Sequence, residues 1–106
     1  MKLILALAAP IAALALAAPA HADQYDYVSV LDNEGVYYDS ISDVIDLGKM
    51  TCRILRSGSE LAVAARNIAG AGYRGYEIGV IVQSAASNMC PDVLPALRAF
   101  LNGHSA

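Results

Sequence analysis

Residues 40–58, SISDVIDLGKMTCRILRSG, carry the strongest helical pattern in this chain and decide its fold class. Ser40 or Ser42 can accept hydrogen bonds from the free amide groups that begin a helix, and Gly58 suits the left-handed residue that often follows its end. This stretch therefore predicts a long amphipathic helix that ends near Ser57. Its inward stripe, at the spacing of one helix face, comprises Ile41, Val44, Ile45, Gly48, Cys52 and Leu55.

Shorter helical patterns lie on both sides of this stretch, and glycines separate them from it. Residues 26–34 place apolar side chains at helical spacing and predict a first helix that stops at Gly35. Residues 59–70 do the same and predict a third helix that ends at Gly70 and Gly72.

The remainder of the chain predicts two more helices. Residues 75–89 include strand-favouring valines and isoleucines, but the segment is too long for a typical strand, so we predict a helix. Pro91 breaks this helix, and Asp92 can cap a last one that ends before Gly103. The side chains of this last helix that should face inward are Leu94, Leu97, Phe100 and Leu101.

The N-terminal segment has the pattern of a secretory signal peptide. Lys2 precedes an apolar run, and small residues at Ala20 and Ala22 provide the pattern that signal peptidase cleaves. We expect cleavage after Ala22, with a cut after Ala20 as the alternative. Prolines interrupt the run, which is shorter than the roughly 20 apolar residues of a spanning helix, so no transmembrane segment is expected after cleavage. The chain then divides into a signal peptide, residues 1–22, and an exported domain, residues 23–106, secreted or held in the cell envelope.

The charge of the exported domain excludes two classes of partner. After Ala22 the chain contains ten acidic and six basic residues, a net charge of −4, and its basic residues form no cluster. Nucleic acids and anionic lipids are bound through concentrated positive charge, so neither is an expected partner. A single small domain of this size is commonly held together by a disulfide, a metal or a partner in addition to its core.

The exported domain contains two cysteines, Cys52 and Cys90, which are expected to form one disulfide in an oxidising compartment. Two cysteines without an internal histidine provide too few metal ligands and no base for thiol catalysis. The α-carbons of a disulfide lie about 4.4–6.8 Å apart, whereas packed helix axes lie about 8–10 Å apart. Gly48 and Ala86, one turn before the cysteines, are small enough for a close helix crossing. The chain therefore predicts an all-α, single-domain bundle of four to five short helices linked by one disulfide.

The sequence around the cysteines resembles a family of small exported proteins. The shared pattern is Leu-Gly-x-x-x-Cys-x-x-Leu-x-x-Gly, residues 47–58 here, with a late Cys-Pro at Cys90 and Pro91. It is similar to the pattern of small exported actinobacterial, mostly mycobacterial, proteins of domain of unknown function 732, over about Tyr27 to Pro91. The resemblance implies a compact helical domain with a Cys52–Cys90 disulfide and assigns no catalytic or binding residue.

Two further patterns suggest chemistry but are better explained by structure. Residues 70–75 match Gly-x-Gly-x-x-Gly, yet the segment before them is helical rather than a strand, so we expect a turn and no dinucleotide site. Asp39, Asp43 and Asp46 share helical spacing, and carboxylates in the first turns of a helix stabilise its positive end. The one histidine after the signal peptide, His104, is two residues from the C-terminus. We therefore expect no cofactor, no metal and no enzymatic activity.

Tyrosines are the main candidates for a binding surface. Tyr37 and Tyr38 precede the central helix, and Tyr73 and Tyr76 follow the glycine turn. Packing at the edge of the core is the simpler interpretation, and a recognition patch is the other, because tyrosines in loops are common at protein interfaces. If the two segments adjoin in space, the four tyrosines form one aromatic face. The sequence thus favours an exported, non-enzymatic binding module whose partner is a protein.

A carrier of a small apolar ligand is the alternative function. The apolar residues of one short segment could line a cavity between helices, which is where such ligands bind in helical bundles. These residues are Ile78, Val80, Ile81 and Val82.

Overall fold

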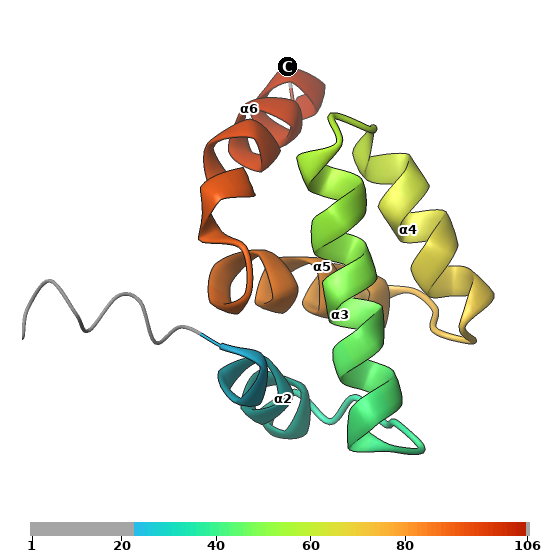
Figure 1. Ribbon diagram of the computed structural model, residues 1–106. Helices are drawn as coiled ribbons and strands as arrows, with labels where there is room; N and C mark the ends of the chain where they lie inside the picture. Colours follow the sequence, from blue (N-terminus) through green and yellow to red (C-terminus); the bar gives the residue numbers. More distant parts are fainter. Residues whose placement is uncertain (1–22, 106) are drawn as a thin grey trace, which may run out of the picture.

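A computed structural model describes residues 23–105, which form five α-helices and one short 3-10 helix (Figure 1). The predicted signal peptide, residues 1–22, lies outside the described residues. The described part of the chain contains no strand, so the predicted all-α fold is confirmed, including a helix over the strand-favouring segment. The α-helices are α2 (Gln24–Asn33), α3 (Ile41–Arg56), α4 (Leu61–Gly70), α5 (Tyr76–Asn88) and α6 (Leu94–Ser105), and the 3-10 helix is Pro91–Val93.

The ends of α3 are formed by the residues that the sequence suggested. The Ser40 hydroxyl accepts a hydrogen bond from the Asp43 amide at 3.0 Å, and Gly58 adopts a φ of +83° after the last turn. Arg53 and Arg56 lie in the last turn, where positive charge favours the negative end of the helix dipole. Caps and charges therefore define this helix locally, before any packing.

The first helix begins earlier than the pattern predicted. The carboxylate of Asp23 accepts hydrogen bonds from the amides of Tyr25 and Asp26 at 2.9 and 3.0 Å, so α2 begins at Gln24. The apolar spacing does not reveal this extra turn, because a side-chain cap fixes the start of a helix independently of its buried face.

The core lies where α2, α4 and α5 pack around α3, which runs through the middle of the view in Figure 1. No helix among residues 23–105 has the length and apolar character needed to cross a bilayer. Burial of this shared apolar surface is the main force that holds the helices together. The largest fully buried side chains are Tyr27, Leu31, Ile68, Ile81, Thr51 and Cys90.

Two positions on α3 differ from the predicted inward stripe. Ile41 is 51% exposed, because helical spacing assigns a face but not how far along the axis the neighbouring helices reach. Thr51, which the stripe omitted, is fully buried. Its hydroxyl donates to the Leu47 carbonyl at 2.9 Å. The hydroxyl therefore has a hydrogen-bond partner within the helix, and its burial leaves no polar group unpaired.

The C-terminal helix α6 extends beyond the ends of α3 and α4 (Figure 1). Leu97 is buried as predicted, but Leu101 is 45% exposed and Gly103 lies inside the helix rather than after it. Asp92 does not cap α6, because the intervening 3-10 helix places its carboxylate beside the guanidinium of Arg56 instead. The last α-helix therefore begins at Leu94, after the 3-10 turn that contains Asp92 and one residue later than a cap at Asp92 would place it.

Tyr27 anchors α2 to α3 through its ring and its hydroxyl. The side chain is fully buried, and its hydroxyl donates to the Val44 carbonyl at 2.9 Å. Burial raises the pKa of Tyr27 above its ordinary value of 10.0, and nearby Tyr73 raises it further. The folded protein therefore favours the neutral phenol more strongly than the unfolded chain does.

Replacement Tyr27→Phe is expected to lower the free energy of unfolding by about 1 kcal/mol at neutral pH, because one buried hydrogen bond is lost. The stability that depends on the neutral phenol is fully present below the unfolded pKa near 10.0 and is lost as the pH rises above it. Urea unfolding at about pH 8 and about pH 11 checks both points. The difference between wild type and variant should shrink at the higher pH, and a difference that stays constant would contradict the assignment.

Candidate functional site

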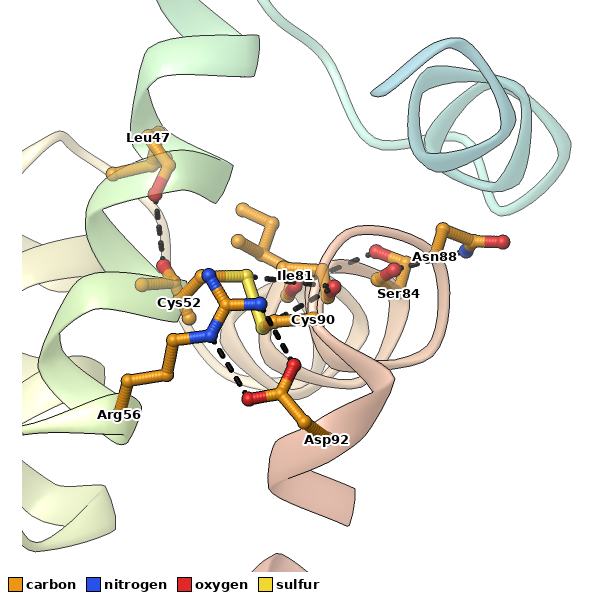
Figure 2. The surroundings of a disulfide bond; sticks show 10 residues. Leu47, Cys52, Arg56, Ile81, Ser84, Asn88, Cys90 and Asp92 are labelled. Atoms are coloured by element: carbon orange, nitrogen blue, oxygen red, sulfur yellow. Dashed lines mark hydrogen bonds and ion pairs between the residues drawn. A yellow bond between two sulfur atoms is a disulfide. The ribbon is translucent and has the colours of Figure 1, made fainter. Parts of the chain in front are cut away.

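The disulfide between Cys52 and Cys90 joins α3 to the segment that follows α5 (Figure 2). The two α-carbons lie 5.9 Å apart, and both cysteines are buried. The predicted pairing is confirmed, but the predicted close crossing of two helices is wrong, because α5 ends at Asn88 and Cys90 has an extended φ of −147°. A residue before proline avoids the helical conformation, so Pro91 forces this departure.

Gly48 and Ala86 do not provide the predicted close crossing of two helices at the disulfide. A Cβ atom added at Gly48 would lie 2.9 Å from both the Met89 sulfur and the Cζ atom of Tyr27. Gly48 thus makes room for a tyrosine ring from α2 and for the residue just before Cys90. Ala86 is fully buried in α5 as part of the general core.

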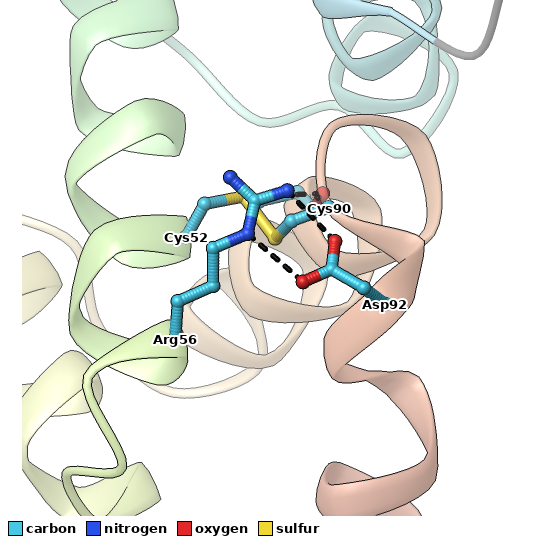
Figure 3. Close-up of polar contacts among 5 residues, drawn as sticks. Cys52, Arg56, Cys90 and Asp92 are labelled. Atoms are coloured by element: carbon cyan, nitrogen blue, oxygen red, sulfur yellow. Dashed lines mark hydrogen bonds and ion pairs between the residues drawn. A yellow bond between two sulfur atoms is a disulfide. The ribbon is translucent and has the colours of Figure 1, made fainter. Parts of the chain in front are cut away.

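Arg56 and Asp92 lie beside the disulfide and form an ion pair in front of it (Figure 3). The guanidinium donates two hydrogen bonds to the carboxylate, at 2.7 and 2.9 Å, and they lower the pKa of Asp92. Both sulfur atoms are buried and lie 3.7 Å from the Ala85 carbonyl oxygen. A thiolate in solution would need access to one of these sulfurs to attack the bond, so the geometry is that of a structural disulfide.

The two tyrosine-bearing segments adjoin in space. The hydroxyl of Tyr73 donates to the carbonyl of Tyr37 at 2.8 Å, and the hydroxyl of Tyr76 donates to the carbonyl of Glu34 at 3.1 Å. The loop before α3 and the turn before α5 are therefore fastened to each other. We call the face formed by Tyr37, Tyr38, Tyr73 and Tyr76 the tyrosine surface.

The tyrosine surface combines structural and exposed rings. Tyr38 and Tyr73 are partly buried and pack against the core, whereas Tyr37 is 72% and Tyr76 is 62% exposed. Packing at the edge of the core thus describes Tyr38 and Tyr73, whereas the rings of Tyr37 and Tyr76 are left exposed. Sequence reasoning could not separate them, because all four lie in segments of the same polar and glycine-rich character.

Carboxylates surround the phenol groups of this surface. Tyr37 donates to Asp39 and Tyr38 donates to Asp32, each at 2.8 Å, and these hydrogen bonds raise the pKa values of both tyrosines. Partial burial raises the pKa of Tyr73, and the negative charge of Glu77 raises it further. The raised pKa values keep the phenols of Tyr37, Tyr38 and Tyr73 protonated at neutral pH, so they act as hydrogen-bond donors beside acidic side chains.

A hollow of about 230 Å³ opens between the tyrosine surface and the start of α3. Two aromatic side chains, two carboxylates and three apolar side chains line it: Tyr38, Tyr73, Asp39, Asp43, Val44, Leu47 and Ala71. It lies between the first turns of α3 and the turn that links α4 to α5.

The other sequence patterns have structural explanations. Residues 70–75 link the end of α4 to α5, with Gly72 and Gly75 at φ values of +105° and +58°, which only glycine adopts readily. Asp39, Asp43 and Asp46 are exposed, and the described residues contain no cluster of three or more potential metal ligands.

The apolar segment 78–82 contributes mainly to the core. Ile81 and Val82 are buried, and Ile78 and Val80 pack against the core with part of their surface exposed. Core packing accounts for the apolar character that suggested a ligand carrier. A separate apolar cleft of about 260 Å³ lies where α6 meets the end of α3 and the start of α4, and it includes Leu55, Leu61, Leu97 and Phe100.

Comparison with known proteins gives a match to a protein family. A family model described as Protein of unknown function (DUF732) matches residues 22–92, which include both cysteines and the whole tyrosine surface. A search of curated proteins and a search of solved structures found no significant match. The match ends at Asp92, so α6 lies outside it.

Proposed function

This chain belongs to the family described as Protein of unknown function (DUF732), and we propose that it acts as a non-enzymatic binding module through the tyrosine surface. The observation that carries the proposal is the exposure of Tyr37 and Tyr76 on two segments that are hydrogen-bonded to each other. Exposed aromatic rings on a backbone that hydrogen bonds hold in place lose little conformational entropy on binding, which favours their use as contact residues.

The partner that we propose is a protein. Tyrosine is enriched in protein interfaces, where its ring supplies apolar area and its hydroxyl a hydrogen bond. Tyr38 and Tyr73 pack against the core, and the Tyr73 hydroxyl is bonded to the Tyr37 carbonyl, so the backbone that carries Tyr37 is tied to the core.

We propose that the protein is exported to the cell envelope or the extracellular space of an actinobacterium, such as a mycobacterium. The support is the signal-like N-terminal sequence together with a buried disulfide, which persists in oxidising compartments. The proposed absence of catalysis is supported by the roles found for the candidate groups: the cysteines are bonded to each other, and the phenols are bonded to carboxylates or carbonyls.

The double variant Tyr37→Ala/Tyr76→Ala should lose crosslinking to the partner by about fivefold or more, because a tyrosine at the centre of an interface commonly contributes above about 1 kcal/mol. The measurement is in-cell crosslinking of the tagged full chain, with mass spectrometry used to quantify one and the same crosslinked protein in wild type and variant. Tyr37→Ala alone should give a smaller loss in the same direction.

The matched control is Tyr25→Ala, which removes a tyrosine that is 63% exposed at the beginning of α2, away from the tyrosine surface. It should leave the crosslinked amount unchanged. Unfolding curves of all variants identify any loss that comes from destabilisation. Equal losses in Tyr25→Ala and in Tyr37→Ala/Tyr76→Ala would reject the tyrosine surface as the binding site.

A further inference from the structure

We infer that the tyrosine surface recognises a basic segment of its protein partner and receives a lysine or arginine side chain in the hollow between Tyr38 and Tyr73. The inference rests on the proposed function and adds the chemistry of the partner to it. It is carried by the composition of the hollow and by the charges around it.

The lining of the hollow suits a long cationic side chain. Tyr38 and Tyr73 provide aromatic rings, Val44, Leu47 and Ala71 provide apolar contacts, and two carboxylates complete the lining. A lysine or arginine side chain has an apolar stem and a charged end, so it needs both kinds of contact. Rings attract cations through their electron-rich faces, and carboxylates bind ammonium or guanidinium groups by charged hydrogen bonds.

Among residues 23–105, no basic side chain pairs with the two carboxylates of the hollow. The ion pair found among the described residues is Arg56 with Asp92, at the other end of α3 and near the disulfide (Figure 3). The Asp39 carboxylate accepts a hydrogen bond from the Tyr37 hydroxyl. The hydrogen bond between Asp43 and Ser40 is donated by the Asp43 backbone amide and does not involve its carboxylate. Both negative charges are therefore available to a cation from outside.

Charge is unevenly distributed between the two ends of the molecule. Near the hollow, Asp32 and Glu77 add to the two lining carboxylates, and Arg74 is the one basic residue in the two tyrosine-bearing segments. The basic residues of α3 lie in its second half, from Lys49 onward. An interface is favoured when its potential complements that of the partner, so the acidic end selects a basic segment.

A second copy of this chain is the competing occupant. Lys49 and Arg53 are exposed and line a broad depression beside the disulfide, so one copy could present them to the acidic end of another. Such head-to-tail contacts would produce a concentration-dependent assembly. We favour a different protein as the partner. The basic side chains of α3 line a depression on a helix surface, together with Cys52 and Met89, whereas entry into the hollow needs a side chain that projects from a loop.

The test is a nuclear magnetic resonance titration of the ¹⁵N-labelled, oxidised protein with the peptide acetyl-Gly-Arg-Gly-amide. The expected result is saturable shifts of backbone amides in residues 38–47 and 71–73. The same peptide with citrulline in place of arginine keeps the shape but lacks the charge, and it should cause no saturable shift. A lysine peptide should shift the same amides, because ring and carboxylate contacts act on either cation.

Asp43→Asn should weaken the binding of the arginine peptide by roughly two- to fivefold, the effect of losing one partly exposed ion pair. Asp46→Asn, on the same helix but outside the hollow, removes the same charge. It should change the affinity less than twofold, because salt screens the attraction between the peptide and a charge that it does not contact. Equal weakening in both variants would show that net charge, not the hollow, attracts the peptide, and would overturn the inference.

Two further outcomes would also overturn it. One is the absence of localised shifts with the arginine peptide while crosslinking still depends on Tyr37 and Tyr76, which would leave the proposed function in place and reject a cationic partner. The other is a shift of the same amides on dilution of the protein alone, which would assign the hollow to a second copy of the chain.

Discussion

The double variant Cys52→Ala/Cys90→Ala is expected to unfold with a free energy about 4 kcal/mol lower than that of the oxidised wild type. The disulfide spans a sequence separation of 38 residues, and closing a loop of that length restricts the unfolded chain by about this amount. A small domain has a total stability of about 5–15 kcal/mol, so the loss is a large fraction of it. Urea unfolding of both proteins, monitored by circular dichroism, measures the difference.

Reduction provides an independent control for the disulfide. Wild type that is unfolded, reduced and refolded in a reductant should have a stability close to that of the double variant, while the reductant should leave the double variant unaffected. Both sulfurs are buried, so reduction of the folded wild type should be slow and should follow unfolding. A double variant that matches oxidised wild type in stability would contradict a structural role for the bond.

Gly48→Ala is expected to lower the free energy of unfolding by about 2 kcal/mol, although alanine favours a helix over glycine by about 1 kcal/mol. The added methyl group would lie 2.9 Å from the Met89 sulfur and from the ring of Tyr27. Met89 can move, but the Tyr27 ring is fully buried and its hydroxyl is bonded to Val44. The overpacking cost therefore exceeds the gain in helix propensity.

Gly79→Ala is the matched control, since Gly79 also lies inside a helix but has no atom within 4 Å of an added Cβ. This variant should be more stable than wild type, by up to about 1 kcal/mol, through helix propensity alone. Chemical unfolding of the two alanine variants compares both directly. If both substitutions stabilise the protein equally, the space in front of Gly48 is not filled by Tyr27 and Met89.

The sequence predicted those features of the fold that depend on local chemistry. Ser40 and Gly58 mark the two ends of α3 because a cap and a left-handed glycine act on their own backbone neighbours. The cysteine pair was predictable because only two cysteines are present. The helical state of α5 was predictable from its length, in spite of its strand-favouring residues.

The features that were not predicted depend on neighbours distant in sequence. The role of Gly48 is determined by the ring of Tyr27, 21 positions earlier, and no periodicity reveals that contact. Thr51 was missed because its hydroxyl is satisfied by the preceding turn, which makes a polar residue compatible with the core. The hollow combines side chains from α3 with Tyr73, so its lining emerges only when the two loops are placed together.

The disulfide also divides the chain by the way it transmits force. When the protein is pulled from its two ends, tension enters at Cys52, crosses the sulfur–sulfur bond and leaves at Cys90. While the bond is intact, the 38-residue loop between the cysteines cannot extend, which shortens the fully stretched chain by up to about 140 Å. Helices α4 and α5 lie inside this closed ring, so they carry no tensile load while α2 and α6, which lie outside it, are stretched.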